Sequence, residues 1–173
     1  MDSSKDKAII MWIRDIILAV VIALCISFFV KPTIVKGKSM QPNFKDGDYL
    51  LATKIFSVES LEKGDVVTFK APDGRTYIKR VIGLPGDKIE VKEGKVYING
   101  IEDDQSYTLD GQTDKEVSVT VPKNAVFCMG DNRLDSEDSR KKDIGCVSID
   151  KLRWKVQIRL FPEITTDFQV YDK

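Results

Sequence analysis

The chain has 173 residues, enough for one domain with a substantial hydrophobic core plus a terminal appendage. Its 27 basic and 27 acidic residues cancel to a formal net charge of zero, which argues against nucleic acid as a partner. The chain contains no histidine, which excludes a Ser-His-Asp triad and most zinc sites, because imidazole is the base or a usual ligand there.

The first element predicted along the chain is an apolar helix at residues 8–30, interrupted only by Arg14 and Asp15. As a helix the stretch would span roughly 34 Å, enough for the ~30 Å hydrocarbon core of a bilayer. A cleavable signal peptide and a buried core helix are the alternatives. Lys31-Pro32 follows instead of a small-x-small cleavage site, and a helix apolar on all faces is unusual before a β-patterned domain. We therefore expect residues 1–30 to form a short tail and an anchor in the lipid bilayer, while the lysines and arginine at both ends leave its orientation open.

The chain after the anchor is patterned for strands. Short segments rich in Val, Ile, Tyr and Phe alternate with turns marked by glycine, aspartate and proline. Period two over residues 152–160 is typical of a half-buried strand, and Glu93-Gly94 predicts a hairpin turn. Strands are expected at residues 48–54, 65–70, 76–83, 88–98, 116–121, 125–130 and 152–160. The predicted fold class is mainly β, with residues 31–173 forming one antiparallel, barrel-like domain.

Three cysteines lie in apolar sequence contexts: Cys25, Cys128 and Cys146. An odd number cannot all pair within one chain. Two interpretations remain open here: buried free thiols, which we favour, and a disulfide between Cys128 and Cys146.

Ser39 lies in the sequence GKSMQP, a turn context in which a serine could act as a nucleophile. Its hydroxyl needs a base, and with carboxylates too weak and arginines always protonated, lysine remains. In TYIKRVIG, period two places Lys79 on one strand face with Tyr77 and Val81. Burial there would lower its pKa to the order of 8–9 from about 10.4. The alternative is an edge-strand lysine that reaches solvent.

Four segments carry a family resemblance: GKSMQPNFKDGDYLLATK, GDVVTF, YIKRVIGLPGD and MGDNRLDSEDSR. In this order behind an N-terminal anchor they resemble the conserved segments of bacterial type I signal peptidases of the compact single-anchor type. The resemblance implies a membrane-anchored serine endopeptidase with a Ser-Lys dyad, which removes signal peptides from secreted preproteins after small-x-small motifs. It implies no cofactor or metal, and a catalytic domain on the extracytoplasmic side of the cell membrane.

The same resemblance assigns roles to individual residues. Ser39 matches the nucleophile, Lys79 the general base, and Ser136 the serine that orients the lysine. The positions that match substrate-binding wall residues are Met40, Phe44 and Tyr77. The positions that match structural charges behind the site are Arg80, Asp131, Asp138 and Arg140, with Arg80 expected to pair with Asp131.

Two positions depart from the family pattern. Gly37 stands where some members carry a serine whose hydroxyl stabilises the oxyanion, so the Ser39 N–H must carry more of that stabilisation. The second oxyanion donor is left open, with the Gly37 region as one candidate. Asn43 stands where threonine is usual, which we interpret as a tolerated polar exchange.

Other functions explain parts of the pattern. Self-cleaving SOS repressors share Ser-Lys chemistry, but nothing here resembles their DNA-binding helix-turn-helix. A non-enzymatic, membrane-tethered β module that binds a partner would make Ser39 a turn residue and residues 130–140 a solvated acidic loop. A calcium loop there is disfavoured, because Arg133 occupies the third position.

Overall fold

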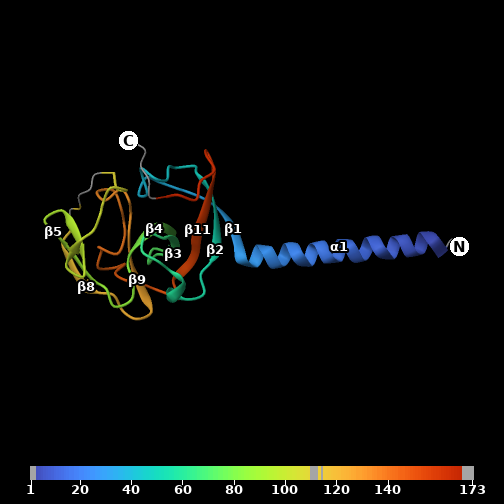
Figure 1. Cartoon of the computed structure of the whole chain (residues 1–173), viewed down its shortest axis with the longest axis horizontal. Coiled ribbons are helices and arrows are strands. Elements are labelled where there is room, and N and C mark those ends of the chain that lie inside the picture. The colour runs from blue at the N-terminus through green and yellow to red at the C-terminus, as the bar shows by residue number, and fades with distance from the viewer. Residues whose placement is uncertain (1–2, 110–112, 114, 169–173) are drawn as a thin grey trace.

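The computed structural model describes residues 3–109, 113 and 115–168. Helix α1 (Ser3–Phe29) projects as a single rod from one side of a β domain (Figure 1). Its Ile9–Phe29 stretch is long and apolar enough to cross a membrane, and none of it is buried by protein. Within it Arg14 and Asp15 pair with each other at 2.8 Å, which lowers the cost of placing either charge near lipid. The predicted helix is confirmed and is consistent with membrane anchoring.

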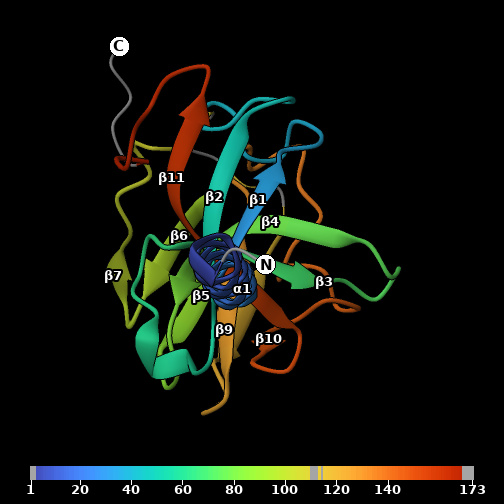
Figure 2. The ribbon, with the colours of Figure 1, turned by 90° about the vertical axis from the view of Figure 1, so that its right-hand side faces the viewer.

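The β domain has two antiparallel sheets, which confirms the predicted fold class. The larger has seven strands in the order β1-β2-β11-β3-β4-β9-β10, and the smaller has the order β7-β6-β5-β8. The smaller sheet lies at the end of the domain far from α1, whereas β1, β2 and β11 lie side by side near it (Figures 1 and 2). The strands are β1 (Val30–Ile34), β2 (Tyr49–Lys54), β3 (Val66–Lys70), β4 (Thr76–Gly83), β5 (Lys88–Lys92), β6 (Lys95–Ile98), β7 (Ile101–Glu102), β8 (Val117–Thr120), β9 (Ala125–Met129), β10 (Val147–Ser148) and β11 (Leu152–Phe161).

The seven predicted strand segments all form, and the predicted hairpin turn separates β5 from β6. Glu93 and Gly94 both have positive φ, 52° and 79°, as a tight two-residue turn requires. The sequence pattern predicted none of β1, β7 and β10: β1 follows the helix directly and contains Pro32, and β7 and β10 are only two residues long. Proline is tolerated in β1 because this strand lies at the edge of its sheet.

The predicted alternation of β11 fails at its C-terminal end. Register shifts interrupt its pairing with β2 between Val156 and Ile158 and again between Arg159 and Phe161. An extra residue in one strand reverses the faces that follow it. Consequently Leu160 is exposed, while Arg159 is half-buried and bonds to the loop between β1 and β2.

Strand β4 separates the parts of the hydrophobic core. Tyr77 and Val81 face a cluster with β3 and β9, while Ile78, on the opposite face, packs on a second cluster. We call the second group the Met40 cluster; it consists of Val35, Met40, Phe44, Leu50, Val66 and Val156. Successive side chains of a strand point to opposite faces, and both faces of β4 are covered, so neighbouring residues are buried in different clusters.

The cysteines are free thiols, so the Cys128–Cys146 disulfide is excluded. Cys128 is buried and Cys146 is half-buried. The expectation of burial is wrong for Cys25, which is exposed on α1.

Candidate active site

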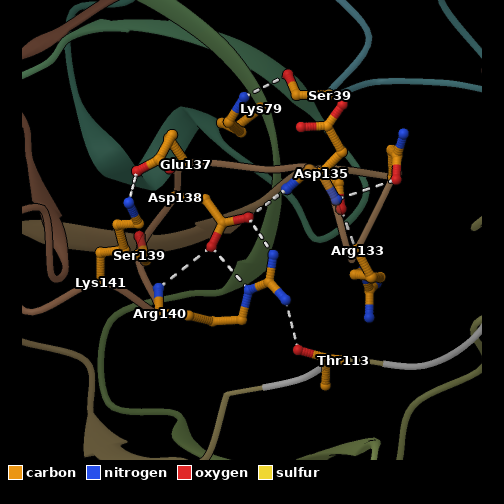
Figure 3. A network of polar contacts seen from close by, with 12 residues as sticks. Ser39, Lys79, Thr113, Arg133, Asp135, Glu137, Asp138, Ser139, Arg140 and Lys141 are labelled. Atoms are coloured by element: carbon orange, nitrogen blue, oxygen red, sulfur yellow. Dashed lines mark hydrogen bonds and ion pairs between the residues drawn. The ribbon is translucent and has the colours of Figure 1, made fainter.

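Ser39 and Lys79 lie in direct contact. Ser39 is in the loop between β1 and β2, Lys79 is in β4, and their side chains point toward each other (Figure 3). The Lys79 Nζ lies 2.6 Å from the Ser39 Oγ, a short hydrogen-bond distance. The strand alternation that places Lys79 on an inward face thus brings its amine to the turn that carries Ser39.

The backbone around Ser39 is fixed by a compact turn. The Gln41 N–H donates to the Lys38 carbonyl at 3.0 Å, and the Phe44 N–H donates to the Met40 carbonyl at 2.9 Å. The Met40 and Phe44 side chains are fully buried in the Met40 cluster. Burial of these side chains holds the turn against the sheet, so that Ser39 remains at the surface facing β4.

Lys79 is in an environment that favours the neutral amine. Its side chain is buried, and this desolvation lowers its pKa from 10.5 to about 8, although the buried carboxylate of Asp138 opposes the shift. Its backbone pairs with Val67 of β3, and the Tyr77 ring centroid lies 5.3 Å from the amine. A pKa of about 8 leaves a substantial neutral fraction near neutral pH, as a general base requires.

Ser136 lies beside the dyad but does not bond to Lys79. Its hydroxyl is buried and makes no hydrogen bond of good geometry among the described residues, although it lies close enough to Asp138 to help lower the pKa of that carboxyl. Gly130 separates it from Ser39: a Cβ built on Gly130 would lie 2.3 Å from the Ser136 Oγ and 2.5 Å from the Ser39 carbonyl oxygen. Only glycine allows this close approach. The expected orienting role of Ser136 therefore stays a prediction.

Two buried ion pairs lie behind the site, and the expected Arg80–Asp131 pair is one of them, at 2.7 Å. In the other, Arg140 Nη2 lies 2.8 Å from Asp138, whose carboxylate also accepts a hydrogen bond from the Gly130 N–H (Figure 3). Burial alone would raise the pKa of Asp138, but the Arg140 hydrogen bonds lower it below its ordinary value. Asp138 therefore stays ionised, and the two buried pairs hold the loop at residues 130–140 in place.

Gly37 is not available as an oxyanion donor in this structure. It has a φ of 90°, a left-handed conformation suited to glycine, and its N–H donates to the Asp46 carboxylate at 2.7 Å. The Gly37 N–H, which the sequence left as a candidate second oxyanion donor, is thus already bonded to Asp46. In contrast, the Ser39 N–H has no acceptor among the residues that the structure describes.

The proposed substrate-wall residues differ in their access to solvent. Phe44 is completely buried, so it supports the turn from within the core. Met40, which follows Ser39 in the chain, is also buried. Tyr77 is half-buried, and its hydroxyl donates a hydrogen bond to the Asp73 carboxylate. Their contacts with substrate stay predictions. Among the residues described, no group of three or more His, Cys, Asp or Glu side chains is placed to hold a metal ion.

Sequence reasoning missed the residues that connect the Ser39 turn to the rest of the domain. Asn43, treated above as a tolerated exchange, donates to both Asp131 and the Tyr107 carbonyl. Phe168 packs on Phe44, with 5.0 Å between ring centroids. The unusual residue type at position 43 was the single sequence signal that pointed to any of them.

Comparison with known proteins decides the family. The model of the family described as "Signal peptidase, peptidase S26" matches residues 9–161. The chain belongs to this family. The peptidase is 35% identical over 176 residues to signal peptidase IB of Staphylococcus aureus strain COL, which covers 90% of this chain and 91% of that protein. It is 38% identical over 150 residues to signal peptidase I S of Bacillus subtilis strain 168, covering 79% and 81%.

A crystal structure of a signal peptidase I from Enterococcus faecalis aligns with a TM-score of 0.47 and 28% identity, over 56% of this chain and 96% of that one. The family match confirms the resemblance found in the sequence. The chain is a serine peptidase of the signal peptidase I type, an enzyme class that removes signal peptides.

Proposed function

We propose that the peptidase cleaves preproteins through a Ser-Lys dyad, with Ser39 as nucleophile and Lys79 as general base. The observation that carries the proposal is the 2.6 Å contact between the Lys79 Nζ and the Ser39 Oγ, made by a buried lysine whose pKa is lowered to about 8. In a chain without histidine, no other group at this contact can accept the serine proton.

The reaction follows from this pair. The neutral Lys79 amine takes the proton of the Ser39 hydroxyl while the oxygen attacks the scissile carbonyl. The resulting ammonium gives that proton to the leaving amine as the peptide bond breaks, which releases the mature chain and leaves an acyl-enzyme. Lys79, neutral again, then takes a proton from water, which hydrolyses the ester and restores the Ser39 hydroxyl.

The negative oxygen of the tetrahedral intermediates needs hydrogen-bond donors. The Ser39 N–H is the first, because it has no acceptor among the described residues. Gly37 does not supply the second while its N–H is bonded to Asp46. We assign the second donor to a water or to a substrate-induced release of that bond.

Ser136 is proposed to orient the Lys79 amine as the reaction proceeds, both while the Ser39 oxygen attacks and after that oxygen is esterified. Its hydroxyl is buried beside the dyad, and this supports the role, because a buried hydroxyl gains from a hydrogen bond to an amine that moves toward it during the reaction. A small apolar pocket beside Met40 and Tyr77 would admit alanine and reject larger side chains, which accounts for small-x-small specificity.

The location proposed for the enzyme rests on α1 for the anchor and on the family resemblance for the side of the membrane and the cytoplasmic tail. Residues 1–30 anchor it in the bilayer and residues 31–173 form the extracytoplasmic catalytic domain, which meets signal peptides at the membrane surface. The apolar, unburied Ile9–Phe29 stretch supports the anchor. Secreted preproteins are the partners, and no nucleic acid or cofactor is required.

Incubation of the detergent-solubilised chain with a preprotein tests the dyad. Ser39→Ala and Lys79→Ala should each abolish cleavage, and the double variant should be no worse than either alone, since the two groups act as a unit. Lys70→Ala, an exposed lysine of the neighbouring strand β3, is the matched control and should cleave normally. Cleavage by Lys79→Ala would show that another base operates, and no cleavage by the unmodified chain would favour the non-enzymatic binding module.

A further inference from the structure

The turn that carries the nucleophile, residues 39–43, is tied at both ends to one dipeptide, Asp131-Asn132. At its start, the Asn132 N–H donates to the Ser39 carbonyl at 3.0 Å. At its end, the Asn43 Nδ2 donates to the Asp131 Oδ2 at 2.8 Å. The turn and the dipeptide thus form a closed ring, in which the Asn43 side chain supplies the link from the end of the turn.

The Asn43 side chain is held in one orientation. It is 8% exposed, and its Nδ2 also donates to the Tyr107 carbonyl at 2.7 Å. A carbonyl and a carboxylate only accept hydrogen bonds, so the amide nitrogen and not its oxygen must face both partners. The Arg159 Nη1 in turn donates to the Asn43 carbonyl at 2.7 Å, which fixes the backbone of the same residue.

Asp131 also fixes the strand that carries the general base. Its two carboxylate oxygens accept from the Nε and Nη2 of Arg80, at 2.8 and 2.7 Å, and both side chains are buried. Arg80 directly follows Lys79 in β4. One buried carboxylate is therefore bonded both to the turn of the nucleophile and to the residue beside the base.

We propose that Asn43 is a positioning residue for the Ser-Lys reaction, which sets the Ser39 hydroxyl against the Lys79 amine by tying the catalytic turn to Asp131. The inference rests on the proposed function of the dyad. A threonine at position 43 offers a single hydroxyl donor on a shorter side chain, so it cannot donate to the Tyr107 carbonyl and the Asp131 carboxylate together. Asn43 is thus a functional link and not a neutral polar exchange.

The test compares Asn43→Ala and Asn43→Asp with the unmodified chain, all full length in detergent, on a short peptide with an Ala-x-Ala site. We expect kcat to fall by roughly 10- to 100-fold in Asn43→Ala, because the loss of near-attack geometry costs rate more than binding, with KM within about twofold. Asn43→Asp keeps the shape but places a second carboxylate beside Asp131, and should be at least as impaired. Val96→Ala, in the core of the smaller sheet, is the matched control for lost stability.

A second readout does not depend on cleavage. If the turn moves away, water reaches Lys79 and its pKa rises toward the ordinary value. NMR titration of the Lys79 side chain should therefore give a higher pKa in Asn43→Ala than in the unmodified chain, and no change in Val96→Ala. An unchanged Lys79 pKa in Asn43→Ala, or a kcat that falls no further than in Val96→Ala, would overturn the positioning role. Failure of the unmodified chain to cleave would instead count against the proposed function, and the titration would still decide the role of Asn43.

Discussion

Replacement of Lys79 by methionine should stabilise the fold at neutral pH while it abolishes catalysis. The pKa of Lys79 is about 8 in the folded chain, against an ordinary value of 10.5. The gap corresponds to about 3 kcal/mol of unfolding free energy, which the native protein loses by burying this amine. Methionine has a similar length and carries no charge. Because Lys79→Met also gives up the hydrogen bond to Ser39, worth about 1 kcal/mol, the net gain at pH 7 should be about 2 kcal/mol.

The stability gained by Lys79→Met should fall as the pH rises. A lysine with a lowered folded-state pKa binds fewer protons in the native than in the unfolded state between about pH 8 and pH 10.5. The penalty is therefore fully present below about pH 8 and disappears as the pH rises through the ordinary value. All other titrating groups are common to both proteins, so the difference in stability between Lys79→Met and the unmodified chain isolates this lysine.

The assay is denaturant unfolding of both full-length proteins in the same detergent, followed by near-UV circular dichroism, from pH 7 to pH 10.5. We expect the advantage of Lys79→Met to stay constant up to about pH 8, to shrink above it and to vanish or reverse at the upper end of the range. A difference that is independent of pH, or a Lys79→Met protein that is less stable at pH 7, would refute the reasoning that burial lowers the pKa of Lys79.

Three further predictions concern the parts of the molecule around the dyad. A protein that starts near Lys31 should keep the β domain, seen by far-UV circular dichroism, and some activity, because α1 supplies no catalytic group; complete unfolding would contradict this separation. Thr68→Val should raise stability by about 1 kcal/mol in denaturant unfolding, because it removes a buried hydroxyl that has no partner in the described chain; a loss of stability would reveal an unseen partner. Asp131→Ala should lower stability by about 3–5 kcal/mol, since it leaves Arg80 buried and unpaired, and a combined Arg80→Met and Asp131→Leu protein should recover part of that loss.

Much of the fold could be predicted because it depends on local patterns. The apolar helix, the strands and the Glu93-Gly94 turn follow from hydrophobic period and turn chemistry, which act over a few residues. The end of β11 could not be predicted in the same way. Its register shifts depend on pairing with β2, and they turn Arg159 inward, against the alternation that the sequence shows.

The candidate site shows the same division. Strand alternation and the absence of histidine made Lys79 a candidate base for Ser39, and the family resemblance of four segments was needed to choose it over an edge-strand lysine. Contacts between distant segments could not be predicted from local patterns. Examples are the hydrogen bond from the Asn43 amide to the Tyr107 carbonyl and the one from the Gly37 N–H to Asp46. Residue types thus indicate the chemistry proposed for Ser39 and Lys79, whereas the contacts that align the two side chains depend on tertiary packing.

The most direct test of the Ser-Lys account is the pH profile of kcat/KM on a short Ala-x-Ala peptide, measured for the unmodified chain and for Ser136→Ala. Because Lys79 must be neutral before substrate arrives, kcat/KM should rise with pH through an apparent pKa of about 8. Ser136→Ala should lower the rate without abolishing it, since the amine keeps its burial but loses the hydroxyl proposed to orient it during the reaction. A rising limb near the ordinary lysine value of 10.5, or a profile that Ser136→Ala leaves unchanged in position and height, would contradict a buried Lys79 that is oriented by Ser136.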